Sequence, residues 1–593
     1  MTFPEIRRRE AGTALDFCEL HPVLRRVYAA RGIAHTDELD LSLDRLLPVS
    51  SLEGVDAAAR LLAAHRRQGR VLVVGDFDAD GATSSALVVR ALRSMKFCHV
   101  DFLVPNRFRF GYGLTREIVE LAATRRPSLI VTVDNGISSV DGVEAARALG
   151  IPVLVTDHHL PGETLPRADV IVNPNLKGSA FASPALAGVG VAFYVMAALG
   201  RELGEAEFRA ADLLDLVALG TVADVVPLDR NNRILVAQGL RRIRAGRCAP
   251  GIRALLESAG RRLEQITAAD LGFAAAPRLN AAGRLTDMSV GIACLLADDP
   301  IEAAQLAGQL ARLNEERREI EQRMQLEAVE IAAAVRFDAL GTEALGLCLF
   351  EESWHQGVVG LVAGRIKDRL HRPVIAFARA EDGSLRGSAR SIAGVNIRDA
   401  LDSIATRHPG LVGKFGGHAM AAGMTLLEAD LDRFRAAFAA EVARRADADA
   451  LTGVVHSDGE LQDGELSVDT ARMLRGAGPW GQGFPEPVFD GEFLVMEARV
   501  VGSKHLKLQL GPLCRPKAAG ATSMAAVTTT AVAAVGAPAA RGIDAIAFGY
   551  VGGATEDAAL QRGRQLRIAY RLEVNEYRGV ENLQLNCQHL ELA

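Results

Sequence analysis

Short apolar runs alternate with amphipathic segments in the first third of the chain, which predicts repeated strand and helix units. The clearest run, residues 71–75, begins with Val-Leu-Val-Val and is typical of a parallel strand buried on both faces. Strands that alternate with helices form parallel sheets, so we expect a doubly wound α/β domain here. The other strands are expected at 99–104, 128–133, 151–156 and 169–173.

Three further patterns follow this region. Residues 301–335 form one long helical pattern of about 50 Å, which we interpret as a strut between two domains. Its apolar stripe is Leu306, Leu310, Leu313, Ile320 and Met324. A second α/β pattern begins near residue 341, with strands at 347–350 and 374–377. The last region has short strands and glycine turns, which favour a small barrel. Its strands are expected at 492–501, 505–510, 543–549 and 566–574.

Composition excludes several classes of protein. Of the 593 residues, 49% are apolar and 24% charged, as in ordinary globular chains, and no apolar run reaches 18 residues. The N-terminus has no apolar segment typical of a signal peptide, so we expect a cytoplasmic protein without a membrane segment. The seven cysteines are scattered without Cys-x-x-Cys spacing, so any metal is expected to be held by oxygen and imidazole. A net charge of −6 argues only weakly against a nucleic-acid partner.

Three aspartates, Asp76, Asp78 and Asp80, follow the first strand. In extended chain, residues i, i+2 and i+4 share a face, so we expect these carboxylates to converge beyond the carboxyl end of the strand. Open α/β sheets place their ligands at that end. Three ionised carboxylates repel one another unless a cation lies among them. The alternative is a solvated acidic turn, which is common for one aspartate and less so for three.

Polar residues also follow later elements of the same region. Asp134 comes after the third strand, His158 and His159 after the fourth, and Asp224 at the end of a helical segment. Groups at the same end of neighbouring parallel strands meet in space. A cluster rich in aspartate, with histidine and without cysteine, suits Mn²⁺ or Mg²⁺ better than zinc. A histidine at a strand end is more often structural, so the coincidence of these elements carries the prediction.

These segments resemble the four ordered motifs of the DHH phosphoesterase superfamily. They are Gly75-Asp-Phe-Asp-Ala-Asp-Gly81, Val131-Thr-Val-Asp-Asn-Gly136, Asp157-His-His159 and Gly220-Thr-Val-Ala-Asp224. Three later segments narrow the resemblance to the RecJ family, bacterial 5′→3′ exonucleases specific for single-stranded DNA. They are Pro277-Arg-Leu-Asn-Ala-Ala-Gly-Arg284, Ser353-Trp-His-Gln-Gly-Val-Val-Gly360 and Gly416-Gly-His-Ala-Met-Ala-Ala-Gly423. The resemblance runs from about residue 20 to the C-terminus.

The resemblance implies roles for individual residues. The metal ligands for one or two Mn²⁺ or Mg²⁺ ions are implied to be Asp76, Asp78, Asp80, Asp134, His158 and Asp224. The implied catalytic residues near the scissile phosphate and the strand are His159, Arg278, Asn280 and Arg284. The implied substrate contacts, some of them at the 5′ end, are Arg107, Tyr112, Ser388, Arg390 and His418. Some superfamily members have a histidine where this chain has Val74, so the ligands of a second ion would have to be completed otherwise.

Family resemblance also implies the domain organisation. We predict an α/β multidomain protein with a doubly wound parallel-sheet DHH domain, a long connecting helix, an α/β DHHA1 domain and a C-terminal OB-fold β-barrel. The boundaries are expected at 1–50 for an N-terminal helical lead-in, 51–300 for DHH, 301–340 for the helix, 341–450 for DHHA1 and 451–593 for the OB-fold. The alanine-rich segment 515–541 is expected to be a loop within the barrel.

The barrel offers candidate DNA contacts, although aromatics in a barrel are as often part of its core. The candidates are Lys504, Lys507, Arg564, Arg567 and Arg571, with Phe484, Tyr550, Tyr570 and Tyr577.

The predicted function is metal-dependent hydrolysis of single-stranded DNA from the 5′ end, releasing nucleoside 5′-monophosphates in recombination and repair. The resemblance implies a single-strand-binding protein and a RecQ-type helicase as partners, but no docking motif indicates either. Two alternatives stay open: a non-catalytic DHH-fold scaffold, and a phosphatase acting on short oligonucleotides or pyrophosphate. A scaffold has no physical reason to crowd several metal ligands at one point, which argues against the first alternative. A phosphatase acting on short substrates has no use for a third domain, so that domain favours a polymer substrate.

Overall fold

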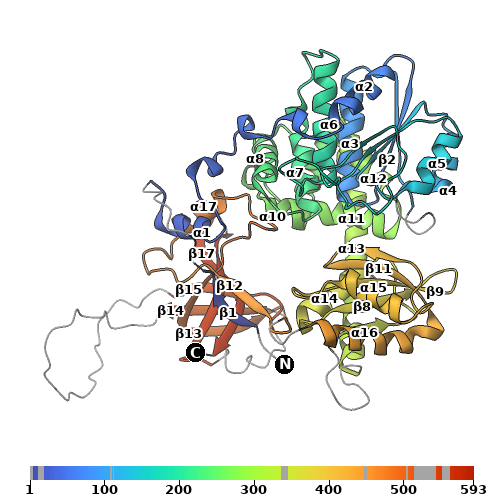
Figure 1. The fold of residues 1–593 in the computed structure, drawn as a ribbon. Helices are drawn as coiled ribbons and strands as arrows, with labels where there is room; N and C mark the ends of the chain where they lie inside the picture. The colour runs from blue at the N-terminus through green and yellow to red at the C-terminus, as the bar shows by residue number, and fades with distance from the viewer. Residues whose placement is uncertain are drawn as a thin grey trace, which may run out of the picture. The chain divides into compact units, whose positions relative to one another are not determined.

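In the computed structural model, the chain folds into two compact units (Figure 1). The first unit comprises residues 40–452 and 479–484, and the second comprises residues 2–39, 453–478 and 485–593. Among the residues that the structure describes, no helix has the length and apolarity needed to cross a membrane. The structure describes residues 4–10, 12, 19–106, 110, 113–334, 345–446, 450–502, 505–512, 542–550, 561–577 and 579–592.

The first unit begins with a parallel sheet whose strands occur in the order β3-β2-β4-β5-β6. The chain therefore enters at β2, adds β3 on one side and then adds the other strands on the opposite side. Ligands of such sheets lie where the order reverses, between β2 and β4. All five predicted strands are confirmed: β2 (Arg70–Gly75), β3 (His99–Leu103), β4 (Leu129–Val133), β5 (Val153–Thr156) and β6 (Val170–Val172).

Helices cover both faces of this sheet. On one face, Leu72 and Val74 of β2 pack with Ile118 of α4 and Val143 of α5. On the other side, α3 and α6 contact β2 and β4, and α2 and α7 pack against them. The covering helices are α2 (Val55–Ala64), α3 (Ala79–Ser94), α4 (Arg116–Ala123), α5 (Val140–Ala148), α6 (Gly188–Glu202) and α7 (Leu214–Ala223).

A helical layer completes the part of the first unit that contains this sheet. Within it, the π-helical turn η6 (Leu271–Ala275) leads directly into α11. The α-helices of the layer are α8 (Arg230–Arg244), α9 (Pro250–Glu257), α10 (Ala268–Asp270), α11 (Ala276–Leu285) and α12 (Ser289–Leu296).

The predicted strut is the helix α13 (Pro300–Ala334), 35 residues long, which packs on α9, α11 and α12 and then on α14 and β7. The predicted apolar stripe is only partly right, because Leu306, Leu313 and Ile320 are half-exposed. Small and polar side chains take most of the buried positions. At mid-helix the Arg317 guanidinium donates to Asn314 at 3.0 Å and to Glu321 at 2.9 Å, so the helix is polar where it leaves one core and enters the next.

The second α/β part of the first unit has a mixed sheet in the order β10-β11-β9-β8-β7. Only β7 and β8 are parallel, and the other neighbours are antiparallel. The strands are β7 (Leu347–Phe350), β8 (Val374–Arg379), β9 (Ser384–Arg390), β10 (Phe415–Gly417) and β11 (Ala421–Leu427). The helices are α14 (Val359–Leu370), α15 (Ile397–Arg407) and α16 (Leu431–Arg445).

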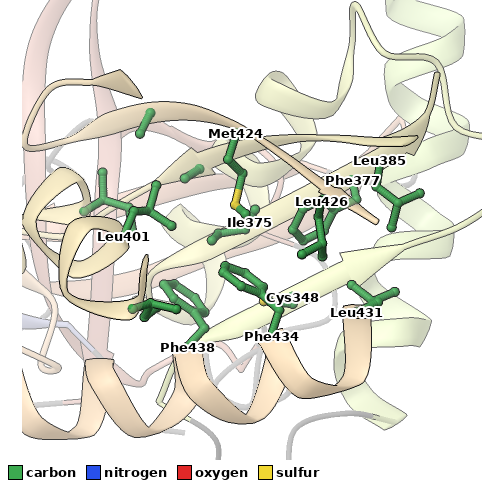
Figure 2. Packing of buried hydrophobic residues seen from close by; sticks show 14 of the residues in the cluster. Cys348, Ile375, Phe377, Leu385, Leu401, Met424, Leu426, Leu431, Phe434 and Phe438 are labelled. Carbon is green, nitrogen blue, oxygen red and sulfur yellow. The ribbon is translucent and has the colours of Figure 1, made fainter. Parts of the chain in front are cut away.

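Alternate residues of β7 and β8 face two separate cores. Figure 2 shows Cys348, Ile375 and Phe377 packed against Phe434 and Phe438 of α16. Their chain neighbours point to the opposite face, where Leu347, Leu349, Val374 and Ala376 meet α13 and α14. The sheet is therefore the middle layer between two helical layers. This explains why β7 and β8 read as continuous apolar runs in the sequence.

The second unit contains a closed five-stranded barrel in the order β13-β14-β15-β17-β16, as expected for an OB-fold. All its neighbouring pairs are antiparallel except β15 with β17. The strands are β13 (Phe489–Val501), β14 (His505–Pro512), β15 (Ile543–Ala547), β16 (Gln565–Tyr577) and β17 (Val580–Leu592). The predicted alanine-rich loop, 515–541, lies outside the described residues.

The N-terminal segment is part of the second unit, and its strand was not predicted. The strand β1 (Glu5–Arg8) pairs in parallel with β12 (Val454–Ser457). After α1 (Pro22–Ala29), the Arg31 guanidinium donates to both carboxylate oxygens of Asp458 at 2.8 and 3.0 Å, and both side chains are buried. The unit also includes α17 (Val468–Gly476). Local periodicity carries no information about pairing between distant segments, so the sequence predicted only helical segments here.

Several barrel residues proposed as DNA contacts have other partners. Tyr570 is buried in the barrel core beside Phe489 and Phe493. Phe484 belongs to the first unit, where its ring stacks on Trp480 and lies under the Arg233 guanidinium. Three basic residues form ion pairs, Lys507 with Asp544, Arg567 with Asp490 and Arg571 with Glu486. Arg564 donates to Gln561, Tyr550 is half-exposed, and Lys504 and the Tyr577 side chain are not described.

Candidate metal centre and substrate cleft

Three aspartates lie where β2 turns into α3. Asp76 is buried and follows β2, Asp78 is the N-cap of α3 with its Oδ1 accepting from Gly81 N at 3.0 Å, and Asp80 lies in the first helical turn. The predicted extended arrangement is wrong, because the helix begins at Ala79. A strand, a tight turn and a helix start bring the carboxylates to the same end of the sheet instead.

Asp80 is anchored by the N-terminus of α6. Its two carboxylate oxygens accept from the backbone of Gly188 at 2.7 Å and of Val189 at 2.9 Å. A helix N-terminus favours negative charge, so this contact stabilises a buried carboxylate. Gly188 also lets Asp134 approach, since a Cβ at residue 188 would lie 2.6 Å from Asp134 Oδ1. Gly188 is a site residue that the sequence reasoning missed.

Backbone strain occurs at the centre. Asp134, directly after β4, has a φ of +60°, and Val225, directly after Asp224, has a φ of +63°. A β-branched residue in this region is a genuine outlier, and such strain concentrates at functional sites. The strained residues fix the direction in which the chain leaves β4 and α7, and therefore the direction of the two carboxylates.

His158, which follows β5, contacts residues at the ends of β4 and α7. Its Nε2 lies 3.1 Å from Asp134 Oδ1 and 3.4 Å from Asp224 Oδ2. The six predicted ligands fall into overlapping groups whose ligand atoms lie within 4.8 Å of one another. The groups are Asp76, Asp78 and Asp134; Asp80, His158 and Asp224; and Asp134, His158 and His159. The structure thus brings all six together.

The carboxylates of the centre oppose one another's ionisation. Burial raises the pKa of Asp134 well above its ordinary value, and the charges of Asp80, Asp78 and Asp224 raise it further. Burial and the charges of Asp224 and Asp78 likewise raise the pKa of Asp80. A divalent cation would relieve this repulsion, and oxygen with one imidazole is a donor set that suits Mn²⁺ or Mg²⁺. The residues therefore fit such an ion.

His159 is held by Asp157, a residue that was not among the predicted site residues. Its Nδ1 lies 2.8 Å from Asp157 Oδ1, and the same oxygen accepts from the backbone of His158 at 2.7 Å. Burial acts to lower the pKa of His159, but the hydrogen bond and charge of Asp157 raise it to about 9. This shift favours the positively charged imidazolium form of His159, beside a cluster of carboxylates.

A cavity of about 710 Å³ opens beside His159. The His159 ring lies parallel to that of His418, with centroids 5.9 Å apart. Burial and the neighbouring His159 lower the pKa of His418. The cavity is lined by apolar groups such as Phe77 and by the cations Arg386, Arg398 and Lys414. It therefore suits an anionic ligand with an apolar part.

The helix α11 carries three predicted catalytic residues, which contact different partners. Asn280 Oδ1 accepts from Ala79 N at 2.8 Å, so it supports the turn that presents Asp78 and Asp80. The Arg278 guanidinium folds back, 2.7 Å from Ala274 O and 3.4 Å from Ser258 O. Arg284 Nη1 donates to Gly357 O at 3.1 Å, just before α14. The three side chains are therefore distributed along α11.

Two of the substrate residues predicted in the second α/β part, Ser388 and Arg390, meet at the start of α14. Arg390 Nη1 lies 3.1 Å from Ser388 Oγ on the same face of β9. A Cβ at Gly360, in the first turn of α14, would lie 2.8 Å from Ser388 Oγ and 2.9 Å from Arg390 Nη2. Gly360 therefore lets the helix N-terminus approach both groups, an arrangement that suits a phosphate. Arg107 and Tyr112 lie outside the described residues.

Profiles of known protein families match three parts of the chain. Residues 70–221 match the DHH family, N-terminal domain, and residues 341–444 match the DHHA1 domain. Residues 457–519 and 524–589 match the RecJ OB domain. These matches cover the first sheet, the second sheet and the barrel.

Curated relatives match the whole length. The chain is 52% identical to the single-stranded-DNA-specific exonuclease RecJ of Dickeya dadantii over 596 residues, covering 99% of both chains. It is 51% identical to the protein of the same name from Escherichia coli, covering 98% of both chains. Among solved structures, RecJ of Thermus thermophilus in complex with Mn²⁺ is 31% identical with a TM-score of 0.78, covering 100% of this chain and 79% of the other. The chain therefore belongs to the RecJ family of single-stranded-DNA-specific exonucleases.

Proposed function

We propose that this protein hydrolyses single-stranded DNA from the 5′ end and releases nucleoside 5′-monophosphates, with Mn²⁺ or Mg²⁺ as cofactor. The observation that carries the proposal is the convergence of five carboxylates and His158 at the carboxyl end of a parallel sheet. The Thermus thermophilus relative was solved in complex with Mn²⁺ and also with Mg²⁺, which supports the choice of ion.

The six predicted ligands would hold one or two ions. They are Asp76, Asp78, Asp80, Asp134, His158 and Asp224. A bound divalent ion would supply Lewis acidity, making a water molecule more acidic and neutralising charge that develops on the phosphate. The centre does not use Val74, the position of the superfamily histidine, since the Val74 side chain is buried in the apolar core beside Ile130.

Protein groups would stabilise the phosphate during the reaction. The His159 imidazolium, oriented by Asp157, can donate a hydrogen bond to a non-bridging oxygen. Asn280 keeps the aspartate turn in place from α11, while Arg278 and Arg284 add positive charge along the same helix. His418 would contact the substrate from the second sheet, next to His159.

A terminal phosphate pocket would account for the polarity. Ser388, Arg390 and the N-terminus of α14 surround one point, and Arg284 reaches the loop before the same helix. A 5′-phosphate carries an extra ionisable oxygen and has no chain beyond it, so such a pocket can distinguish it from an internal phosphate. Arg107 and Tyr112 stay part of this proposal on the strength of the sequence alone.

Substituting Asp157 with asparagine tests the role of His159. Asp157→Asn is expected to lower kcat on single-stranded DNA by about tenfold, because the amide keeps the shape but not the charge that orients and stabilises the imidazolium. Initial rates with a 5′-labelled strand measure the effect. Asp169→Asn is the matched control, since Asp169 also accepts a backbone N–H, from Val153 at 2.8 Å, at the opposite end of the sheet. Equal rates for both variants would contradict the role.

The function itself is tested with end-labelled DNA. Purified protein is mixed with 5′- or 3′-labelled single-stranded and double-stranded DNA, with Mn²⁺ or with EDTA. We expect labelled mononucleotide at the earliest times from the 5′-labelled single strand with Mn²⁺, and no product with EDTA. Product from short oligonucleotides alone would favour the phosphatase alternative, and absence of hydrolysis with every metal would favour a scaffold.

Cellular partners and location belong to the same proposal. A 5′→3′ exonuclease needs single strands that another enzyme exposes, so we propose a RecQ-type helicase and a single-strand-binding protein as partners in recombination and repair. This activity would take place in the cytoplasm, where bacterial DNA is located.

A further inference from the structure

One large aromatic side chain in the helical layer of the first unit faces solvent. Phe273, in the π-helical turn η6, is 78% exposed. Val225, which directly follows Asp224, is 63% exposed. Neither side chain contributes to the core, so their apolar surfaces are available to a ligand.

The wide turn that presents Phe273 has a local cause. Pro277 has no N–H, and its ring would clash with the carbonyl four residues earlier, which belongs to Phe273. The helix avoids the clash by widening, and Ala276 N donates to Leu271 O, five residues back. The Arg278 guanidinium then folds onto the same turn, 2.7 Å from Ala274 O. The phenyl ring therefore belongs to the same turn that the Arg278 guanidinium contacts.

This turn lies beside the metal centre. A Cβ at Gly272 would lie 3.2 Å from Val222 Cγ1, near the end of α7 and two residues before Asp224. At the other end of the same helical segment, Asn280 binds the aspartate turn at Ala79 and Arg284 binds Gly357 before α14. Asn280 and Phe273 are seven residues apart, or about 10 Å along the helix.

Arginine side chains lie near the turn that holds the ring. Burial lowers the pKa of Arg278, the neighbouring cations Arg318 and Arg261 lower it further, and the charge of Glu315 acts in the opposite direction. Arg261 and Arg318 are exposed, and Arg261 forms an ion pair with Asp270 at 3.2 Å. Guanidinium groups suit a polyanion, and an exposed aromatic ring on the turn that Arg278 contacts suits a nucleobase.

We propose that Phe273 is a stacking platform for a base on the 3′ side of the scissile phosphate. The proposal rests on the proposed exonuclease function and adds a path for the strand. With the 5′-phosphate held at Ser388 and Arg390, the strand would pass the metal centre at Asn280 and continue along α11 to Arg278 and Phe273. Stacking accepts any base, so the platform would hold the strand without sequence preference.

A scan with abasic residues tests the platform. The strand is a 5′-phosphorylated 12-mer with one abasic residue at successive positions, and binding is measured by fluorescence anisotropy in an Asp134→Asn background, which prevents hydrolysis. In this background, the protein that keeps Phe273 should lose about 5- to 30-fold in affinity when the abasic residue is at one or two positions near the 5′ end. Phe273→Ala should bind the intact strand correspondingly more weakly and should be insensitive to abasic residues at those positions.

Kinetic measurements on the active protein distinguish a loss of base stacking from a structural effect of the substitution. Phe273→Ala should raise KM for the 12-mer about 5- to 30-fold, while kcat and the hydrolysis of a 5′-phosphorylated dinucleotide, which is too short to reach the ring, stay unchanged. Phe273→Trp should restore KM and Phe273→Leu should not. Leu326→Ala, which removes a 65% exposed side chain from α13, is the matched control and should behave as wild type.

Two results would overturn the platform. One is an abasic profile of Phe273→Ala identical to that of the unsubstituted protein, and the other is a KM for the 12-mer that does not change. Failure of the unsubstituted protein to degrade single strands would instead refute the proposed exonuclease function, and the platform with it.

Discussion

Asp134→Asn is expected to reduce the rate of single-stranded DNA hydrolysis by at least about 10³-fold. Asp134 belongs to two of the three ligand groups and lies 3.1 Å from His158 Nε2, so its loss removes charge from the middle of the centre. A metal ion supplies several kcal/mol of transition-state stabilisation, and about 4 kcal/mol corresponds to roughly 10³-fold in rate. Initial rates with 5′-labelled strands at saturating Mn²⁺ measure the effect.

The choice of asparagine follows from the backbone at residue 134. Its φ of +60° is tolerated by aspartate and asparagine, whereas alanine would add about 1 kcal/mol of strain. Asp134→Asn should therefore keep or slightly raise the melting temperature, because it also relieves the repulsion from Asp80 and Asp78. Asp134→Ala should lose the same activity with a less stable fold. Asp141→Asn, an exposed carboxylate in α5, is the control, and a rate for Asp134→Asn close to that of this control would refute the metal centre.

The sheet and the clustering of the candidate ligands could be predicted because each rests on local signals. The buried strand at 71–75 reads as a continuous apolar run, and every predicted strand of the first sheet occurs in the structure. Asp134 and His158 follow strands β4 and β5, and parallel strands end at the same edge. The chemistry of the residues that follow each strand was then enough to predict a shared site.

Other features depend on contacts that periodicity does not encode. The direction of the Asp80 carboxylate is set by Gly188, which lies more than a hundred residues later in the chain. Asp157 orients His159 through a hydrogen bond, although by sequence it reads only as part of a motif. The backbone strain at Val225 has no sequence signal, because valine is rarely chosen for that conformation.

Aromatic and polar residues misled the sequence reasoning for a similar reason. Phe484 was expected to face DNA from the barrel, but it packs in the first unit under Arg233. Leu313 and Ile320 of α13 were expected in an apolar stripe, but the buried side chains from residue 314 to 321 are Asn314, Arg317 and Glu321. Exposure of an aromatic side chain and the pairing of a buried charge are both decided by the tertiary fold.

Arg390→Ala is expected to remove most of the preference for 5′-phosphorylated over 5′-hydroxyl single strands. The Arg390 guanidinium is oriented by Ser388 Oγ at 3.1 Å and by Ala389 O at 2.8 Å, next to the N-terminus of α14. A charge-assisted hydrogen bond contributes about 1.5 to 3 kcal/mol, which is about 10- to 150-fold in affinity. The ratio of kcat/KM for the two strands should fall by this factor. Arg390→Lys should recover only part of it, because an ammonium cannot engage two oxygens at once.

A neighbouring arginine separates recognition of the terminus from general attraction to DNA. Arg386, on the same face of β9, lines the cavity and has an exposed side chain. Arg386→Ala should weaken binding of both strands alike, more so at low salt, and leave their ratio unchanged. Calorimetry should show unchanged Mn²⁺ binding in both variants, because neither residue belongs to the ligand groups. If Arg390→Ala still discriminates the two ends as the unsubstituted protein does, the 5′-phosphate is recognised elsewhere, and the pocket at the start of α14 has another role.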